Sequence, residues 1–308
     1  MLIDYVVVAF RSSSDLPACL DSILADAPGG SRTIVVDNAS PDDSAEVAGA
    51  HPIGAEIVRS DRNLGFGGGC NLGVSRSSAE AVFLLNPDAR LTAGVSSGMI
   101  AALQEDPRVG IVAPRVVDPS GQSRAASAGA SPSLASSIGH FLLVGRIPIL
   151  RRLFPPFYLS EPLIPSQPDW VSGAAMLVRR SAFDEIGGFD ERIFMYMEDV
   201  DICERLWRAG WRVRYEPAFI VEHRIGGSQS TEQPARWYRA FHAYLLQTRG
   251  PLSARLSSMV AGLGLGIRAL AYVRTRPANA TRMRRAAITA FRLALLPSQP
   301  VAPEKTPS

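Results

Sequence analysis

The sequence predicts an α/β protein with a doubly wound, mostly parallel sheet, and three observations support this prediction. Short apolar runs alternate with segments of helical periodicity through residues 1–115. Polar residues directly follow several of the apolar runs, at the strand ends where sheets of this kind bind ligands. The chain has 308 residues, which is enough for one large domain or two smaller ones.

The elements of this first part follow in chain order from these patterns. Apolar runs predict buried strands at Tyr5–Phe10, Thr33–Val36, Ala55–Val58, Ala81–Leu85 and Val109–Ala113. Helical periodicity predicts intervening helices at Asp15–Leu24, Pro41–Val47, Gly69–Arg76 and Ala93–Gln104. The second of these helices is expected to have Ser40 as its N-cap and Pro41 at its first position. Because helices separate the strands, we expect neighbouring strands to be parallel.

The remaining chain is less regular at first. The Ala- and Ser-rich segment Ser123–Ser137 is expected to be a mobile loop, and the proline-rich segment Phe141–Pro168 a lip or a membrane-facing surface. After it, strands are expected at Trp170–Val178, Trp211–Tyr215 and Phe219–Val221, with a short helix at Ser181–Ile186. From Gln233 onward the chain is predicted to be helical and basic.

Three carboxylates within four residues follow the aromatic-rich apolar segment Phe194–Met197. The apolar residues that come next have helical spacing, so we expect a helix whose first turn carries Glu198, Asp199 and Asp201. Such a cluster of carboxylates next to an apolar segment indicates a functional site. The alternative is a surface helix whose acidic first turn suits the helix dipole.

Polar residues also close three predicted strands. Asp37 and Asn38 follow the second strand, where they can accept hydrogen bonds from a base or a ribose. Asp88 follows the fourth strand, and its carboxylate can ligate a hard divalent cation that bridges two phosphates. His223 ends a later strand and is a second candidate ligand. Each of these residues could instead be a turn former or a simple hydrogen-bonded group.

The segment Asp61–Gly73 contains five glycines within nine positions. Glycines permit close backbone approach, and the N-terminus of the helix that follows can face a phosphate. The segment has neither the Gly-Lys-Ser/Thr of a Walker loop nor the register of a dinucleotide fingerprint. A glycine turn with a purely structural purpose is the alternative.

The charge distribution bears on partners. A net charge of +3 is too small to favour nucleic acid as a partner. Arginines gather between Arg236 and Arg292, where acids are almost absent, which indicates an anionic surface as partner. A membrane surface is favoured, and the alternative is that this segment is an ordinary pair of packed helices. The best apolar stretch, Leu252–Val273, is interrupted by Arg255 and Arg268 and is therefore not expected to span a membrane.

A cytoplasmic setting is expected from two further features. The chain begins with a strand-like stretch and no basic n-region, so no signal peptide is expected. The cysteines match no metal-ligand or disulfide spacing, which fits a reducing compartment. They are Cys19, Cys70 and Cys203.

Seven motifs occur in a characteristic order. They are Val-Asp-Asn-Ala-Ser (36–40), Arg-Asn-Leu-Gly-Phe-Gly-Gly-Gly-Cys-Asn-Leu-Gly (62–73), Leu-Leu-Asn-Pro-Asp (84–88), Trp-Val-Ser-Gly-Ala (170–174), Gly-Gly-Phe-Asp-Glu (187–191), Phe-Met-Tyr-Met-Glu-Asp-Val-Asp (194–201) and Val-Glu-His (221–223). The series resembles the family 2 inverting glycosyltransferases of GT-A fold, most closely bacterial rhamnosyltransferases that build lipid-linked cell-wall or O-antigen precursors. The resemblance covers residues 3–230.

The resemblance implies a role for each matching residue. Asp199 would be the general base, and Glu198 and Asp201 would orient the acceptor or the base. Asp88 and His223 would bind a divalent metal, Mg²⁺ or Mn²⁺. Nucleotide-sugar contacts are implied for Ala9, Asp37, Asn38, Arg62, Asn63, Gly65, Gly67, Asn71, Asn86 and Asp88. Acceptor contacts are implied for Trp170, Gly173 and Glu198.

Two departures from the wider family matter. The usual Asp-x-Asp is Asn86-Pro87-Asp88 here, so one carboxylate is missing and strict metal dependence stays open. The Gln-x-x-Arg-Trp motif of processive synthases has the same residue types and spacing as Gln233–Trp237. We interpret this match as coincidental or as a remnant, which favours addition of a single sugar.

The resemblance also implies an organisation and a set of partners. A GT-A domain at 1–230 would contain a Rossmann-like nucleotide-sugar half (1–115), a variable segment (116–168) and an acceptor and catalytic half (169–230). A basic amphipathic helical extension (231–298) and a disordered tail (299–308) would follow. The expected partners are a dTDP- or UDP-linked sugar, a lipid-linked or glycan acceptor, the inner face of the cell membrane and, as an open alternative, a second copy of the chain.

Competing functions are a glycoside hydrolase, which also needs paired carboxylates, and an inactive module that binds a sugar nucleotide or a membrane. A hydrolase needs no nucleotide site, so the first hundred residues argue against it. The resemblance favours dTDP-L-rhamnose as donor, with UDP-galactofuranose or a UDP-hexose as the alternative.

Overall fold

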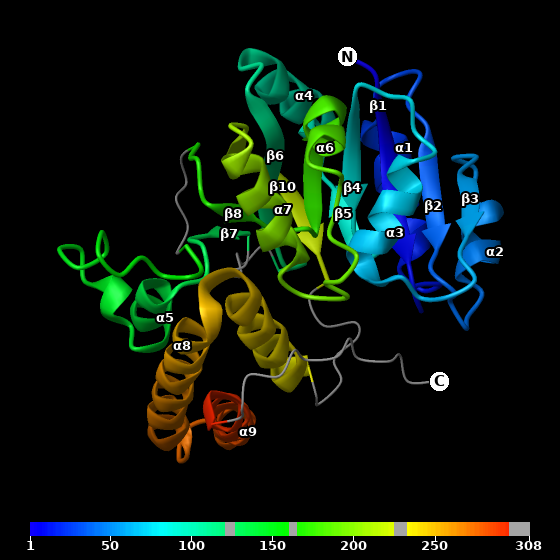
Figure 1. The fold of residues 1–308 in the computed structure, drawn as a ribbon. Coiled ribbons are helices and arrows are strands. Elements are labelled where there is room, and N and C mark those ends of the chain that lie inside the picture. The colour runs from blue at the N-terminus through cyan, green and yellow to red at the C-terminus, as the bar shows by residue number, and fades with distance from the viewer. Residues whose placement is uncertain (121–126, 160–164, 225–232, 296–308) are drawn as a thin grey trace. The chain divides into compact units, whose positions relative to one another are not determined.

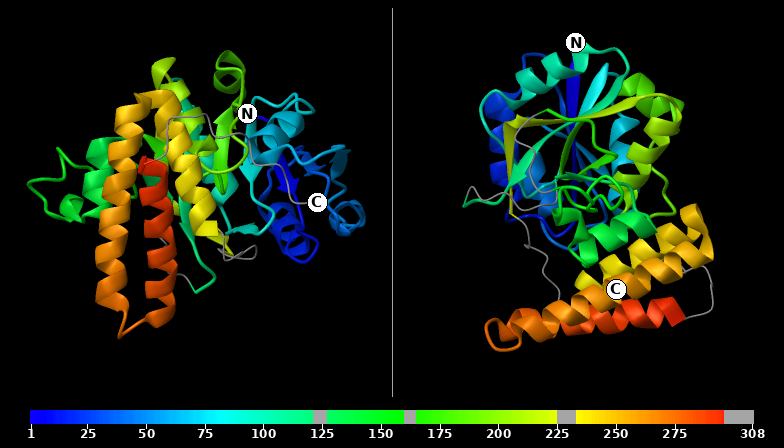
Figure 2. Two further views of the ribbon diagram at one scale, coloured as in Figure 1. Left: turned by 60° about the horizontal axis from the view of Figure 1, so that its bottom comes forward. Right: turned by 90° about the vertical axis from the view of Figure 1, so that its left-hand side faces the viewer.

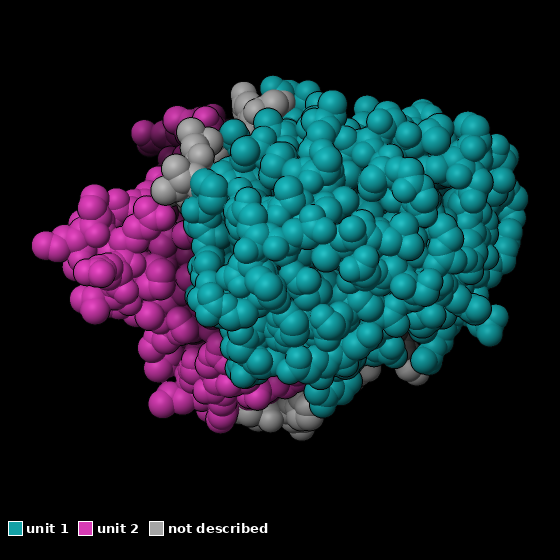
Figure 3. Space-filling model, turned by 90° about the horizontal axis from the view of Figure 1, so that it is seen from above, with its two compact units in different colours: residues 1–128, 160–227, 305–308 teal, residues 129–159, 228–304 magenta. Residues whose placement is uncertain are grey.

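The structure, a computed structural model, describes residues 1–120, 127–159, 165–224 and 233–295. The chain divides into two compact units (Figure 3). The first contains Met1–Ala128 and Ser160–Gly227, and the second contains Gly129–Leu159 and Ser228–Glu304, apart from the residues outside the described ranges. Residues 129–159, which the sequence analysis assigns to the first domain, therefore group with the helical extension.

One mixed sheet forms the centre of the first unit (Figure 1). Its eight strands have the order β3-β2-β1-β4-β9-β6-β10-β5. Neighbours from β3 to β4 are parallel, as are β6 and β10, whereas β9 and β5 are antiparallel to the strands they pair with. The strands are β1 (Ile3–Ala9), β2 (Thr33–Asp37), β3 (Glu56–Arg59), β4 (Ala81–Leu85), β5 (Ala89–Leu91), β6 (Val109–Val117), β9 (Ala175–Arg179) and β10 (Arg212–His223). Two short strands lie outside this sheet, β7 (Ala128–Gly129) and β8 (Trp170–Val171).

Helices cover both faces of the sheet, as a doubly wound fold requires (Figure 2). Side chains of a strand alternate between faces, so Tyr5 and Val7 of β1 meet α1 and α4, while Val6 and Val8 meet α3. The helices of this unit are α1 (Leu16–Asp26), α2 (Ser44–Gly49), α3 (Gly65–Val74), α4 (Val95–Glu105), α6 (Arg180–Glu185) and α7 (Glu198–Arg208).

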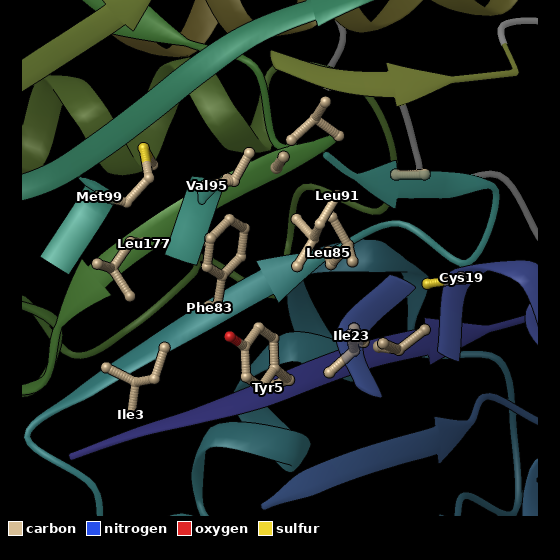
Figure 4. Packing of buried hydrophobic residues seen from close by; sticks show 14 of the residues in the cluster. Ile3, Tyr5, Cys19, Ile23, Phe83, Leu85, Leu91, Val95, Met99 and Leu177 are labelled. Carbon is tan, nitrogen blue, oxygen red and sulfur yellow. The ribbon is translucent and has the colours of Figure 1, made fainter. Parts of the chain in front are cut away.

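The main core lies between the sheet and the helices α1 and α4 (Figure 4). Tyr5 of β1 stacks on Phe83 of β4, with ring centroids 5.6 Å apart. The hydroxyl of Tyr5 lies 2.6 Å from Ser96 Oγ on α4, so its polar end is satisfied in the interior. Burial raises the pKa of Tyr5 to about 12.

The second unit is mainly helical. It contains α5 (Leu134–Phe141), the short 3₁₀ helix η1 (Val144–Arg146), α8 (Gln233–Tyr272) and α9 (Pro277–Leu295). Helix α8 bends at Gly250, whose φ of 83° interrupts the helical backbone immediately before Pro251. Gly264 lies against the carbonyl of Phe141, and α9 packs along α8. Helices α8 and α9 match the expected helical extension.

Several predicted boundaries were wrong. Helix α3 starts at Gly65 rather than Gly69, and its glycines pack closely instead of forming a loop: Gly69 and Gly73 lie against β1, and Gly67 lies against Phe189. Helix α2 starts at Ser44, since the Ser40 hydroxyl donates to Asp42 instead of capping the helix. The expected strand Trp170–Val178 is two strands, β8 and β9, interrupted at residues 172–174.

Other differences concern missed or merged elements. The strands expected at Trp211–Tyr215 and Phe219–Val221 are one strand, β10, with a register shift between Glu216 and Ile220. Strand β5 was not predicted. The expected loop Ser123–Ser137 runs into α5, whose N-cap Ser133 forms a capping box with Ser136. The tail expected at 299–308 lies outside the described residues.

Candidate active site

The ends of three neighbouring parallel strands meet at one edge of the sheet. Ala9 at the end of β1 pairs with Asp37 at the end of β2, and Val7 of β1 pairs with Leu85 at the end of β4. The carbonyl of Ala9 accepts from the backbone N–H of Asn38 at 2.9 Å. Residues that the sequence placed at strand ends are therefore neighbours, as expected for a ligand-binding edge.

Asp37 and Asn38 have different environments at this edge. Asp37 accepts from the N–H of Ser40 at 3.1 Å and lies 3.8 Å from Arg59 Nη1. Asn38 is only 2% exposed, and its amide donates to Asn63 Oδ1 and to the Gly65 carbonyl while accepting from the N–H of Leu64. The Asn38 side chain thus holds the start of α3 in place. Neighbouring Arg62 is exposed.

The glycines of α3 serve close packing. Gly65 has φ +76°, and a Cβ there would lie 2.1 Å from the Phe194 carbonyl oxygen. A Cβ at Gly67 would lie 2.9 Å from Phe189 Cβ. The Asn71 amide accepts from the N–H of Phe189 and donates to its carbonyl, both at 2.9 Å. These positions therefore fix α3 against the segment that leads to the acidic helix.

Asp88 and His223 lie together although 135 positions separate them in the sequence. The unpredicted strand β5 pairs with the end of β10, which places Ala89 opposite His223. As a result, His223 Nε2 lies 2.9 Å from Asp88 Oδ1 and 3.2 Å from Asn86 Nδ2. One carboxylate oxygen and one imidazole nitrogen at this distance can share a single cation.

This pair is a partial metal site. Among the described residues, no group of three or more His, Cys, Asp or Glu side chains is arranged to hold a metal ion. A cation bound by Asp88 and His223 would have to complete its coordination with water or with oxygens of a ligand, as a substrate-bound Mg²⁺ or Mn²⁺ does. The donor set fits such a cation.

The acidic helix α7 starts from a strained backbone. Tyr196 and Met197 both have left-handed φ, 65° and 68°, which is costly for side chains of this size. They directly precede Glu198 and Asp199. Strain of this kind persists where surrounding packing fixes a functional residue.

The three acidic side chains of α7 differ in their partners. Asp199 accepts from the N–H of Gly173 at 3.2 Å and from the N–H of Val200 at 2.9 Å. Asp201 forms an ion pair with Arg205 at 2.7 Å. Glu198 is 9% exposed, and its Oε2 atom has no hydrogen-bond partner in the described structure.

Burial shifts the acidity of all three groups. Burial, followed by the charge of Asp199, raises the pKa of Glu198 to about 8. Burial also raises the pKa of Asp199, against the backbone hydrogen bonds from Gly173 and Val200. Burial raises the pKa of Asp201 as well, although Arg205 opposes the change. Perturbed carboxyl groups in one cluster are typical of catalytic sites.

A short segment joins the acidic helix to the strand-end residues. The carbonyl of Ala174 accepts from the N–H of Asn86 at 2.9 Å, and the adjacent Gly173 donates to Asp199. A Cβ at Gly173 would lie 3.0 Å from the ring of Phe66, so only glycine fits between that ring and Asp199 without a shift. Asn86, Gly173 and Asp199 thus belong to one continuous site.

The structure also shows residues that the sequence analysis missed or placed differently. Phe66 lies beside Gly173, and Arg224 donates from its N–H to the Asp88 carbonyl at 3.1 Å and from Nη1 to Asp15. The Phe-Gly pattern around Phe66 was visible, but no local signal linked it to Gly173. Trp170, a predicted acceptor residue, is only 3% exposed, so it supports the site from within.

Comparison with known proteins identifies the family. The model described as "Glycosyl transferase family 2" matches residues 4–187, which contain Asp37, Asn38, Asp88 and Gly173 but not His223. The chain belongs to glycosyl transferase family 2. A model described as "Glycosyl transferase family 21" also matches residues 154–271. The two acidic residues Glu198 and Asp199 lie beyond the first match and within the second.

Relatives of this glycosyltransferase include two rhamnosyltransferases. N-acetylglucosaminyl-diphospho-decaprenol L-rhamnosyltransferase of Mycobacterium tuberculosis is 33% identical over 250 residues, which is 77% of this chain and 80% of the relative. Rhamnosyltransferase WbbL of Escherichia coli is 53% identical over 55 residues, covering 18% of this chain and 21% of WbbL.

Solved structures confirm the predicted GT-A-like fold of the family 2 enzyme. Mannosyltransferase PcManGT of Pyrobaculum calidifontis, in complex with GDP-Man and Mn²⁺, aligns with a TM-score of 0.62 at 17% identity, over 96% of this chain and 88% of that one. GalNAc-T7 with UDP, GalNAc and Mn²⁺ aligns with a TM-score of 0.57 at 15% identity, over 82% and 51%. None of the described helices combines the length and hydropathy needed to cross a bilayer.

Proposed function

We propose that this family 2 glycosyltransferase transfers one L-rhamnose from dTDP-L-rhamnose, with inversion, to a lipid-linked or glycan acceptor in bacterial cell-envelope polysaccharide synthesis. The observation that carries the proposal is the 33% identity over 250 residues to a mycobacterial L-rhamnosyltransferase. The name of that relative describes its acceptor as a sugar linked through diphosphate to decaprenol, which makes a lipid-linked acceptor the first choice here.

The strand-end residues would bind the donor. Asp37 has a carboxylate that can accept from the nucleoside, and exposed Arg62 can neutralise phosphate charge. Ala9, Asn38, Asn63, Gly65, Gly67 and Asn71 would shape this site through backbone packing and hydrogen bonds rather than through free side chains.

Asp88 and His223 would hold a divalent cation beside Asn86. The cation would supply positive charge that offsets the negative charge developing on the departing diphosphate. Structures of the same fold contain Mn²⁺, and the cation proposed for this enzyme is Mn²⁺ or Mg²⁺.

Asp199 would accept the proton of the attacking hydroxyl. Its hydrogen bonds from the N–H groups of Gly173 and Val200 fix the carboxylate and leave its remaining lone pairs for the acceptor. A single displacement at the anomeric carbon then inverts its configuration. Glu198, buried beside Asp199 with a raised pKa, would keep its proton and so avoid a second negative charge.

Transfer would take place at the inner face of the cell membrane, where a lipid-linked acceptor is held. The arginine-rich helices α8 and α9 support this location. The enzyme would then be cytoplasmic and bind the membrane peripherally.

A thermal-shift screen tests the donor assignment, because a ligand that binds the folded state raises the unfolding temperature. dTDP-L-rhamnose with Mn²⁺ is expected to raise it more than UDP-galactofuranose or UDP-hexoses do. A larger shift with a UDP-sugar would assign that sugar nucleotide as the donor in place of dTDP-L-rhamnose. The proposal that the protein is a glycosyltransferase would stand. No shift with any nucleotide would contradict a donor site and favour an inactive module that binds a membrane.

A further inference from the structure

Helix α8 exposes an apolar stripe after its bend. Five large apolar side chains on it are between 48% and 77% exposed. Their spacings of seven, four, four and three residues place them on one side of the helix. They are Leu252, Met259, Leu263, Ile267 and Leu270. Exposed helix faces are normally polar, so this one indicates a binding surface.

Helix α9 presents a mixed face of arginines and apolar residues. Ile288, Phe291 and Leu295 are exposed at spacings of three and four residues. Arg284, Arg285 and Arg292 are exposed on the same side of the helix. Apolar groups flanked by arginines are typical of helices that lie in the interface of a membrane.

The two exposed faces are continuous. Helices α8 and α9 lie side by side in the second unit (Figure 2). Small residues let them approach closely: a Cβ at Gly262 of α8 would lie 2.9 Å from the ring of Phe291 on α9. Because Phe291 is itself 39% exposed, it connects the two faces at their common border. We call the combined surface the α8–α9 face.

Charge decides between the occupants of this surface. Residues 233–295 contain eleven arginines and no aspartate or glutamate. A second copy of the chain docked through the same face would bring arginines against arginines with no acidic partner. An anionic bilayer complements both the arginines and the apolar side chains.

We propose that the α8–α9 face docks onto an anionic lipid surface. The α8 stripe and the α9 apolar residues would enter the headgroup boundary, while Arg284, Arg285 and Arg292 would contact lipid phosphates. The proposal deepens the proposed function, on which it rests only for the acceptor's location in the membrane. Vesicle binding is measured without donor or acceptor, so its failure and a failure of rhamnosyl transfer are distinguishable.

The test is co-sedimentation of the full-length chain with phosphatidylcholine vesicles that do or do not contain phosphatidylglycerol. Binding is expected only to the anionic vesicles and is expected to weaken in high salt, because salt screens the arginines. Replacing Arg284, Arg285 and Arg292 together by Gln should weaken binding on the order of 100-fold. Replacing Leu263, Ile267 and Leu270 together by Ser should also weaken it strongly.

The matched control replaces three exposed arginines of the first unit, Arg76, Arg108 and Arg192, by Gln and should leave vesicle binding within about twofold. Circular dichroism and thermal unfolding verify that each variant is folded. An intact chain that ignores anionic vesicles at low salt would overturn the proposal, and so would two α8–α9 variants that bind like the native protein. A dimer in solution that the Leu263, Ile267 and Leu270 variant dissociates would assign the face to a second copy instead.

Discussion

The three carboxylates at the start of α7 show how surroundings divide roles among similar side chains. Asp201 is paired with Arg205, whose Nη1 also donates to the Ile186 carbonyl, so this pair ties the helix to the end of α6. Asp199 is held by two backbone N–H groups, and Glu198 is buried with one oxygen unpartnered. Only Asp199 is both fixed and adjacent to Gly173 of the joining segment.

Replacing Asp199 by Asn should reduce kcat by about 10²–10⁴-fold while donor binding stays nearly intact. The amide keeps the shape of the side chain but cannot take the acceptor proton. Asp201→Asn is the matched comparison: it should lower the unfolding temperature by breaking the Arg205 ion pair while kcat falls far less. If Asp201→Asn lowered kcat more than Asp199→Asn does, Asp201 rather than Asp199 would be the general base.

Metal binding should depend on both members of the Asp88 and His223 pair. Asp88→Ala and His223→Ala should each weaken Mn²⁺-dependent binding of the nucleotide sugar by on the order of tenfold or more, since each removes one ligand of the cation. Titration calorimetry of dTDP in the presence of Mn²⁺ measures this. Full activity of the native enzyme in excess chelator would contradict a need for the metal ion. Arginines alone would then have to neutralise the charge of the diphosphate.

Protonation of Glu198 should make stability depend on pH. Its pKa is raised by burial to about 8 in the folded protein, above the ordinary value of 4.5, so folding stabilises the protonated form. The contribution is complete below pH 4.5 and is lost as pH rises through about 8. Glu198→Gln should remove this loss. Denaturant unfolding measures it as a difference in the free energy of unfolding, on the order of several kcal/mol between low pH and a pH above the raised pKa. Equal pH dependence in both proteins would show that Glu198 is ionised in the fold.

Helix α3 shows at the scale of an element why glycine was needed for packing. Gly69 and Gly73 lie one helical turn apart on the side that faces β1, against Val8 and Val6. This close approach sets the position of Gly65, which Asn38 contacts, and of Asn71, which holds Phe189. The packing of α3 on the sheet thus also determines where the segment before α7 lies.

Gly69→Ala should destabilise the fold by about 1–3 kcal/mol, because its Cβ would lie 2.6 Å from Val8 Cγ1. Gly266→Ala is the matched control. No atom lies within 4 Å of a Cβ at Gly266 on α8, so helix propensity alone acts and should stabilise the protein by up to about 1 kcal/mol. Combining Gly69→Ala with Val8→Ala should recover part of the loss in urea unfolding. A neutral Gly69→Ala would show that α3 does not depend on this contact.

Across the whole molecule, the sequence predicted those helices and strands that a local residue pattern determines. Buried runs such as Ala81–Leu85 gave the correct strand, because consecutive apolar residues between turn signals have few other interpretations. The direction of β9 was not predictable in the same way, since an antiparallel strand is chosen by its neighbours β4 and β6. The three-residue strand β5 carries too short a pattern to recognise.

The candidate site shows the same division. Motif order pointed to Asp88, His223 and Asp199, and the structure places the first two 2.9 Å apart. The contact between Gly173 and Asp199 and the place of Phe66 depend on residues far apart in the sequence, so no local pattern could give them. Likewise, Asn71 matched the motif, but only the fold shows that its amide is used by Phe189.

The most direct test of the proposed reaction is an assay of the intact enzyme with dTDP-L-rhamnose, Mn²⁺ and N-acetylglucosamine linked through diphosphate to a polyprenol. We expect one rhamnose added per acceptor, with the anomeric configuration opposite to that of the donor by NMR, and a kcat about 10²–10⁴-fold lower for the Asp199→Asn variant. A product that retains the donor's configuration, or full turnover by Asp199→Asn, would contradict a single displacement assisted by Asp199.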